Sequence, residues 1–441
     1  MKTLYTFGLA LFIHSIYAQP VTVQSGPMNG YANLQEAVVW VQLTGAAEVF
    51  AEAQLLNATE SEIIRSNTIQ TQAENAYTAK LYFHGLKAGN TYNYRIVING
   101  EAVSFDYPTQ ISVPAQWSYR TDPPEINVAM GSCAYINEKP YDRPGKSYGG
   151  GYEIYKSIYS SKPDLMLWLG DNNYLRAGEW WTKRGIQHRY THSRSLPEMQ
   201  PLLATGHHVN IWDDHDYGPN NANGSWVTKD IVLETFKDFT LNYSYGYDDL
   251  PGIMSAYRYG DIDFIITDNR YHRTEQYNDP EEEHIFGKKQ SKRLIEMLKF
   301  SRAPFKIVLT GGQFVNSAKV YENHANYELE RQYILDLIAE EDIKGVIFIN
   351  GDRHHSEVSK LSLPNGKTVH EFTVSPMNSG ANDNVTETND NRVKGSLIQQ
   401  RNYAVLNVKG GFRDRVLTLT YYDVEGKELF QFTLDSDEIY K

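Results

Sequence analysis

The alternation of apolar and polar positions divides the chain into two regions. Between about residues 19 and 115, short runs with apolar side chains at every second position predict β-strands separated by turns, for example at 37–43 and 77–83. Beyond a proline-containing linker over 114–124, strand-like runs alternate with helical patterns. The helical patterns lie near 151–161, 226–242, 288–301 and 326–340. We therefore expect a β-sandwich domain over 19–115 and an α/β domain over 120–441.

One turn in the first region carries a more specific signal. Gly85-Leu86-Lys87-Ala88-Gly89 leads into a strand that places Tyr92 and Tyr94 at alternate positions. This arrangement resembles the tyrosine corner of fibronectin type III and immunoglobulin-like sandwiches. The region gathers no catalytic residue types, so we interpret it as a structural or docking module, with carbohydrate binding as the alternative.

Late strands are predicted at 404–408 and 416–422. We expect them to close a second sheet. The α/β domain would then consist of two facing sheets flanked by helices.

The first 18 residues have the pattern of a secretory signal peptide. A charged start at Lys2 precedes an apolar run over 4–13, and a small-residue exit predicts cleavage after Ala18. A membrane anchor is the weaker alternative, because the apolar run is too short to span a bilayer and no later stretch is long and apolar enough. We expect a secreted or periplasmic monomer without a membrane anchor.

The composition of the chain limits the kinds of molecule that it is expected to bind. The 441-residue chain has a formal net charge of −12, which argues against binding to nucleic acid, other than as a possible substrate, and to anionic membranes. Its only cysteine is Cys133, so no internal disulfide can form.

The most concentrated chemistry lies at 211–220. Asp213, Asp214, His215 and Asp216 directly follow an apolar run ending in Trp212, which reads as the end of a buried strand. Carboxylates held so close repel one another unless protons or a cation neutralise them. A metal site is favoured over an acidic surface turn, since such a turn would not normally follow a buried strand.

Other strand-like runs also end in polar residues. They end at Gly131-Ser132-Cys133, at Gly170-Asp171 with Tyr174 three residues on, at Thr267-Asp268-Asn269-Arg270, at Thr310-Gly311-Gly312-Gln313 and at Gly351-Asp352-Arg353-His354-His355. Open α/β sheets place their sites at this end of the strands, so we expect these side chains to meet there.

These motifs resemble those of the PhoD-like alkaline phosphatases, a family with the metallophosphoesterase fold. The resemblance covers about 120–441 and implies a hydrolase of phosphate esters. It implies one metal held by Cys133, Asp171, Tyr174 and His354, and a second metal that Asp171 bridges and Asp214 and Asp352 complete. Related phosphoesterases have a histidine where Gln313 stands, which leaves the role of Gln313 open.

The donor chemistry indicates which metals would bind. Thiolate, phenolate and carboxylate form a strongly donating anionic set that suits Fe(III), whereas carboxylate and amide oxygens suit Ca²⁺, with Mn²⁺ or Mg²⁺ possible. Metal coordination would also explain a single thiol in an exported protein, because a coordinating cysteine is deprotonated and occupied.

Two further residues are candidates for catalysis. His215 lies between carboxylates that are expected to raise its pKa, and it can donate a proton to the leaving oxygen. Arg270 is a candidate phosphate clamp, as is Arg176, since a guanidinium pairs two phosphoryl oxygens at once. The alternatives are a buried histidine bonded to a carbonyl and an ion pair of Arg270 with Asp268. His355 is expected to be structural.

The sequence thus predicts an exported, metal-dependent hydrolase of a small phosphate monoester or diester, in which a metal-activated water attacks phosphorus in line. Two alternatives stay open. One is a secreted nuclease or phospholipid-cleaving phosphodiesterase, and the other is a non-catalytic protein that binds metal or phosphate.

Overall fold

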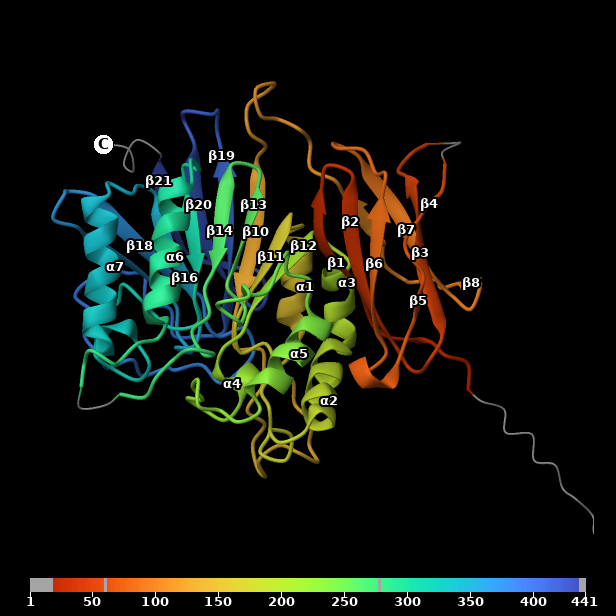
Figure 1. Ribbon diagram of the computed structural model, residues 1–441, viewed down its shortest axis with the longest axis horizontal. Helices are drawn as coiled ribbons and strands as arrows, with labels where there is room; N and C mark the ends of the chain where they lie inside the picture. The colour runs from red at the N-terminus through yellow and green to blue at the C-terminus, as the bar shows by residue number, and fades with distance from the viewer. Residues whose placement is uncertain (1–18, 59–61, 277–278, 436–441) are drawn as a thin grey trace, which may run out of the picture.

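The N-terminal region is a sandwich of two antiparallel sheets at one end of the molecule (Figure 1). The computed structural model describes residues 19–58, 62–276 and 279–435, so the predicted signal peptide over 1–18 lies outside the described residues. One sheet contains β1 (Val23–Asn33), β2 (Glu36–Leu43) and β6 (Thr78–His84). The other contains β3 (Glu48–Leu55), β4 (Ile64–Arg65), β5 (Ile69–Gln70), β7 (Thr91–Ile98), β8 (Glu101–Ala102) and β9 (Gln110–Ser112).

Strand β2 is buried on both faces, and this joins the sandwich to the rest of the protein. Val39 and Val41 face the core between the two N-terminal sheets, whereas Val38 and Trp40 belong to the core of the following α/β region. The Trp40 indole N–H donates to the backbone carbonyl of Asp238, at 2.8 Å. The two regions therefore share a continuous hydrophobic core.

The tyrosine of the predicted corner ties its loop to the sheet. Tyr92 is buried in β7, and its hydroxyl accepts a hydrogen bond from the backbone N–H of Lys87 at 2.9 Å. This is the contact that a tyrosine corner makes in fibronectin-like sandwiches.

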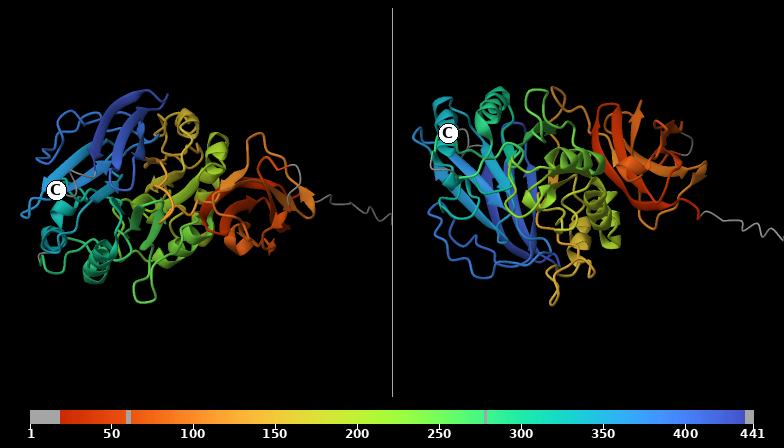
Figure 2. Two further views of the ribbon diagram at one scale, coloured as in Figure 1. Left: turned by 90° about the horizontal axis from the view of Figure 1, so that it is seen from above. Right: turned by 60° about the horizontal axis from the view of Figure 1, so that its bottom comes forward.

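The remaining chain forms two six-stranded mixed sheets (Figures 1 and 2). The first sheet has the order β12-β11-β10-β19-β20-β21. Its strands are β10 (Ile126–Gly131), β11 (Leu165–Leu169), β12 (His207–Ile211), β19 (Asn402–Lys409), β20 (Val416–Asp423) and β21 (Glu428–Asp435). The second has the order β13-β14-β15-β16-β18-β17. Its strands are β13 (Ser255–Tyr259), β14 (Ile262–Ile266), β15 (Lys306–Leu309), β16 (Val346–Asn350), β17 (Glu357–Ser362) and β18 (Thr368–Thr373).

Helices connect and flank the strands. They are α1 (Glu153–Ser160), α2 (Lys183–Arg194), α3 (Gln200–Leu203), α4 (Asp214–Tyr217), α5 (Lys229–Phe239), α6 (Gly287–Phe300) and α7 (Glu328–Glu340). Short 3₁₀ turns occupy Ala73–Asn75, Pro197–Met199 and His324–Asn326.

Alternate side chains of the second sheet face two different cores. Phe264 and Ile266 point toward the first sheet, whereas Ile265 between them packs under α6 and α7. Successive strand residues point to opposite faces, so this near-continuous apolar run suits a sheet that is covered on both sides. The two mixed sheets with their flanking helices confirm the predicted two-sheet α/β architecture, but the position of the last strands differs from the prediction.

The last strands extend the first sheet instead of closing the second. β19 pairs antiparallel with β10, with Val128 opposite Leu406, and β20 and β21 follow outward. The local pattern identified these residues as strands correctly, but pairing between segments some 280 positions apart leaves no local trace in the sequence.

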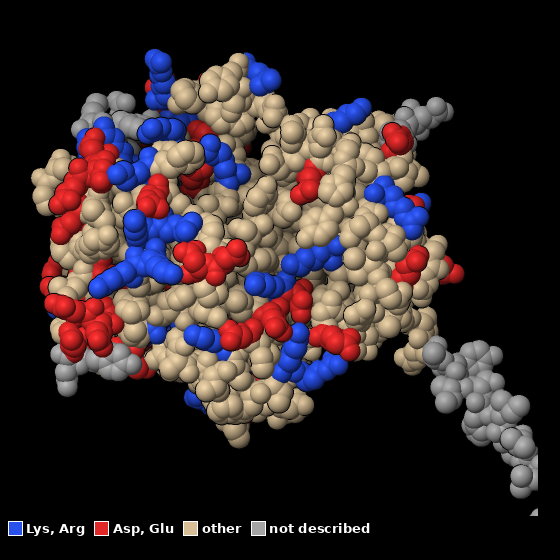
Figure 3. Space-filling view, in the orientation of Figure 1, with Lys and Arg blue, Asp and Glu red and all other residues tan. Residues whose placement is uncertain are grey.

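No helix in the described part of the chain is long and apolar enough to cross a membrane. On the face shown in Figure 3, lysines and arginines are interspersed with aspartates and glutamates.

Candidate metal centre

The backbone bends sharply at four of the six predicted ligands, just after their strands end. Cys133 after β10, Asp171 after β11, and Asp352 and His354 after β16 all have positive φ angles, between 52° and 65°. This left-handed conformation costs non-glycine residues of order 1–3 kcal/mol and is concentrated at functional sites. It turns these side chains out of their strands toward a common point.

The first group of donors consists of a thiol, a phenol, a carboxylate and an imidazole. Asp171 Oδ2 lies 3.7 Å from Cys133 Sγ and 3.2 Å from Tyr174 Oη. Tyr174 Oη lies 3.3 Å from His354 Nε2. Candidate ligand atoms of Cys133, Asp171 and His354 lie within 4.8 Å of one another, close enough to share one ion.

The second group lies on the other side of Asp171. Candidate ligand atoms of Asp171, Asp214 and His215 also lie within 4.8 Å of one another. Asp352 is near enough for its charge to raise the pKa values of Cys133 and Asp213. The structure therefore brings all six sequence-predicted metal residues into one region, with Asp171 between the two groups.

The electrostatics of the first group call for a cation. Burial is the largest cause that raises the pKa of the Cys133 thiol to about 12. Burial, followed by the charges of Asp214 and Cys133, raises the pKa of Asp171 well above its usual range. In the part of the chain that the structure describes, no lysine or arginine forms an ion pair with Asp171. A bound metal ion would supply the missing positive charge, so the donor set fits a metal site.

Backbone contacts hold the ligand loops together. The Cys133 carbonyl accepts from the N–H of Ser379 at 3.1 Å, and the His354 carbonyl accepts from the N–H of Asn382 at 2.7 Å. His354 Nδ1 lies 2.5 Å from the Gly380 carbonyl, to which it must donate. This contact places the lone pair of His354 on Nε2, which faces Tyr174 and Asp171.

His215 is half-buried, and its ring stacks on the Tyr174 ring with a centroid separation of 4.4 Å. The expectation that neighbouring carboxylates raise its pKa was wrong. Burial is the larger effect and lowers the pKa of His215, although the charge of Asp214 opposes it.

Asp216, the last carboxylate of the stretch, is structural. It accepts hydrogen bonds from the backbone N–H groups of Asn172, Asn173 and Asp213, at 3.2, 2.8 and 3.0 Å. It thereby connects the loop after β11 to the start of α4. The resemblance assigned a metal role to Asp214 and none to Asp216, and the sequence alone does not reveal the backbone partners that explain this carboxylate.

The structure corrects the expected role of Arg270. Its side chain is 1% exposed, and it lies between the carboxylates of Asp213 and Glu322. The carboxylate of Asp268 instead accepts from backbone N–H groups, including that of Arg270 itself. Arg270 is therefore neither a substrate clamp nor the ion-pair partner of Asp268, because its guanidinium is enclosed behind the centre.

Arg176 is also engaged by the protein. Its guanidinium bonds Asp142 Oδ1, from Nε at 3.1 Å and Nη2 at 2.5 Å, and stacks 4.2 Å from the centroid of the Tyr135 ring. This side chain supports the loop around the centre and is not free to bind phosphate.

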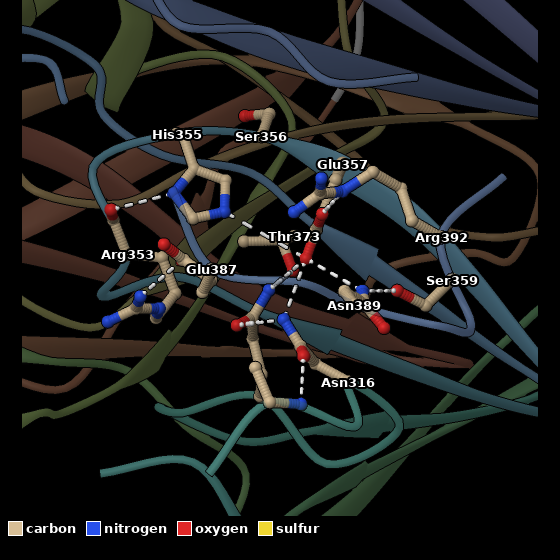
Figure 4. A network of polar contacts seen from close by, with 12 residues as sticks. Asn316, Arg353, His355, Ser356, Glu357, Ser359, Thr373, Glu387, Asn389 and Arg392 are labelled. Atoms are coloured by element: carbon tan, nitrogen blue, oxygen red, sulfur yellow. Dashed lines mark hydrogen bonds and ion pairs between the residues drawn. The ribbon is translucent and has the colours of Figure 1, made fainter. Parts of the chain in front are cut away.

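A separate polar network surrounds the buried carboxylate of Glu357 (Figure 4), and Gln313 belongs to this network. Its amide donates to Glu357 Oε1 at 2.8 Å and to Thr373 Oγ1 at 3.0 Å. His355, which was expected to be structural, lies in the same network, 3.8 Å from Glu357. Neither residue reaches the metal centre.

Comparison with known proteins identifies the family to which this geometry belongs. Residues 128–419 match a family model described as PhoD-like phosphatase, and residues 21–115 match a model described as a domain of unknown function, DUF7800. No curated protein sequence matches the chain.

Two solved structures have the same fold. The structure of PhoD is 18% identical with a TM-score of 0.76, and the match covers 94% of this chain and 90% of that chain. A purple acid phosphatase, PPD1, from seeds of yellow lupin (Lupinus luteus) is 14% identical with a TM-score of 0.67, covering 93% of this chain and 74% of the other. At these identities the likeness shows the fold alone.

Proposed function

Because the chain belongs to the PhoD-like phosphatase family, we propose that it is an exported hydrolase of small phosphoric monoesters or diesters. Family and fold make it a metal-dependent phosphoester hydrolase. The proposal adds export, the reaction and the residues that carry it out. Its main support is the convergence of a thiol, a phenol, a carboxylate and an imidazole from separate strand ends.

Cys133, Asp171, Tyr174 and His354 would hold the first ion, which we assign as Fe(III). Thiolate and phenolate are strong anionic donors that suit a trivalent ion. His354 is prepared for this role, because the Gly380 carbonyl fixes the proton on Nδ1 and leaves Nε2 free.

Asp171, Asp214 and Asp352 would hold the second ion. An all-carboxylate set suits a hard cation, and we assign Ca²⁺, with Mn²⁺ or Mg²⁺ able to replace it. Asp214 is fixed by the backbone N–H groups of Asn221, at 2.7 Å, and His215, at 2.9 Å.

When bound, the metals polarise the phosphoryl group and lower the pKa of the attacking water. The protein positions the other participants. His215 is held by its stacking on Tyr174 and by the short helix α4, with its ring at the half-exposed side of the centre. There its ring N–H can donate a hydrogen bond to the departing oxygen.

Export rests on the N-terminal sequence. The pattern of the first 18 residues predicts cleavage after Ala18, so the exported protein should begin at Gln19. Mass spectrometry of the protein from the medium or periplasm tests this directly.

The central experiment combines metal analysis with a chromogenic monoester and a chromogenic diester on the same sample. The protein should contain iron, show a phenolate-to-iron absorption band and hydrolyse at least one ester. Tyr174→Phe should remove the band. Tyr217→Phe is the matched control, since Tyr217 is also buried nearby and its hydroxyl has no hydrogen-bond partner among the described residues.

The outcomes separate the parts of the proposal. A colourless, fully active enzyme without iron would refute the iron assignment. A protein that binds metal but hydrolyses neither ester would refute the proposed reaction and favour a metal- or phosphate-binding role.

A further inference from the structure

A tyrosine next to the candidate centre has a hydroxyl proton that no group in the described part of the chain accepts. Tyr148 Oη lies 3.2 Å from His354 Nδ1, and the Tyr148 side chain is 46% exposed. His354 Nδ1 also contacts the Gly380 carbonyl at 2.5 Å, which requires a proton on Nδ1. Tyr148 can therefore only accept from this imidazole, and its own O–H remains available to a ligand.

The loop around Tyr148 is built to hold this ring in place. Asn137 bonds the backbone of Gly149 in both directions at 3.1 Å, and Gly150 N–H donates to the Asn378 carbonyl at 2.6 Å. A Cβ at Gly380 would lie 3.1 Å from the Tyr148 ring, tighter than ordinary contact. The ring lies edge-on to Tyr135, with centroids 4.9 Å apart.

The same loop carries a positive charge near the candidate centre that the other nearby arginines do not offer. Arg270 and Arg176 both form ion pairs with carboxylates. Arg143 is exposed, forms no ion pair with another described residue, and lies within electrostatic reach of Tyr148. An anion that approaches the centre would meet this guanidinium beside the free hydroxyl.

We propose that Tyr148 binds the substrate by donating its O–H to a non-bridging phosphoryl oxygen, while Arg143 attracts the same anion. This inference rests on the proposed function of the centre. It makes the loop over 141–148 the substrate-recognition segment, a role that the sequence had suggested for Arg270 and Arg176.

The test is Tyr148→Phe in the metal-loaded enzyme, with Tyr141→Phe as the control. Tyr141 is on the same loop and 54% exposed, but it packs against His188, with ring centroids 5.2 Å apart. A hydrogen bond to a charged oxygen is worth enough to lower kcat/KM about 10- to 100-fold on loss. We expect that loss in Tyr148→Phe for both 4-nitrophenyl phosphate and phenyl phosphate, and about 10-fold weaker inhibition by inorganic phosphate.

The visible absorption band and the metal content separate substrate binding from an effect through His354. Both should be unchanged in Tyr148→Phe. A change in either, or an unchanged kcat/KM, would overturn the inference. A loss confined to phenyl phosphate would also overturn it, because it would place the contact on the leaving oxygen. If the wild type hydrolysed neither these monoesters nor a chromogenic diester, the proposed function would fail, whereas the affinity for inorganic phosphate would still decide the role of Tyr148.

Arg143 is tested by Arg143→Ala against Lys146→Ala. Lys146 has the same charge on the same loop and lines a groove with Glu153 and Asp383. We expect Arg143→Ala to raise KM about 3- to 10-fold at low salt and less at high salt, because exposed charges are screened. Equal effects of the two variants would refute a specific role for Arg143.

Discussion

Replacing Arg270 by alanine should destabilise the protein strongly, because its guanidinium lies between two buried carboxylates. Arg270 Nε bonds Asp213 Oδ1 at 2.5 Å, and Nη2 bonds Glu322 Oε2 at 2.7 Å. The exposed fractions of the three side chains are 1%, 1% and 6%. Truncation would leave the Asp213 carboxylate without its cationic partner in a site closed to water, so it must either stay charged or take up a proton, and either is a costly way to break a buried ion pair.

The expected loss in the free energy of unfolding is about 3–5 kcal/mol. The loss should be smaller than the sum of the losses expected from breaking two independent buried ion pairs, because Asp213 and Glu322 each keep another partner. Glu322 still contacts Arg273, and Asp213 still accepts from the Asn269 amide at 2.6 Å. Adding Asp213→Asn to Arg270→Ala should recover part of the loss, because the uncompensated charge is then removed.

Arg258→Ala is the matched control. Arg258 also bonds a carboxylate through two nitrogens, to Asp263 at 2.6 and 2.7 Å, but its side chain is 58% exposed. Exposed pairs contribute about 0–1 kcal/mol, so this variant should unfold nearly like the wild type.

Urea unfolding of the metal-free protein, followed by tryptophan fluorescence, measures these differences without a contribution from metal binding. Trp212 is a suitable reporter, since it is fully buried and its indole N–H bonds Asp268 at 3.1 Å. A loss below about 1 kcal/mol for Arg270→Ala, accompanied by a large rise in KM, would refute the structural role and restore the phosphate clamp.

Three further predictions follow from other parts of the molecule. Burial is the largest cause that lowers the pKa of His208 from 6.5 to about 3. The His208 imidazole therefore stays neutral in the native state, whereas in the unfolded chain it takes up a proton as the pH falls below 6.5. The free energy of unfolding should therefore be unaffected by His208 well above pH 6.5 and fall by about 3 kcal/mol on its account by pH 4.5. His208→Asn, which can still accept from Trp168, should lack this loss in acid unfolding curves; a pH-independent difference from the wild type would contradict the prediction. Chelation should abolish hydrolysis and lower the unfolding midpoint of the wild type. Without metal, Asp171→Asn should be more stable than the wild type, because the buried carboxylate is removed. Equal unfolding midpoints of the two metal-free proteins would argue against an uncompensated carboxylate at this position. Trp40→Ala should cost about 3–5 kcal/mol in denaturant unfolding, because a fully buried indole is lost from the shared core, whereas Trp117→Ala in the linker should cost much less.

The sequence could locate the strand ends from which the candidate ligands come, because buried hydrophobic runs mark them. Such runs end at Gly131 and Leu169 in the first sheet and at Asn350 in the second, and the facing of the two sheets brings these ends together. The metals bound and the role of each ligand stay predictions.

The roles of the arginines could not be predicted in the same way. Arg176 pairs with Asp142, 34 residues away, and Arg270 with Glu322, 52 residues away. These carboxylates lie in loops whose position depends on the completed fold. An arginine after a strand therefore looks the same in the sequence whether it faces the substrate or a buried acid.

The shared core has a consequence for the linker between the two regions. Tyr119 in that linker is fully exposed, which makes the segment an accessible point for a protease. Cleavage there would produce two fragments that stay associated, because Trp40 and its neighbours would still pack the N-terminal fragment against the rest of the protein, as in an interface between two subunits. A preparation nicked at this point would migrate as two bands on a denaturing gel while it eluted as one particle from a sizing column.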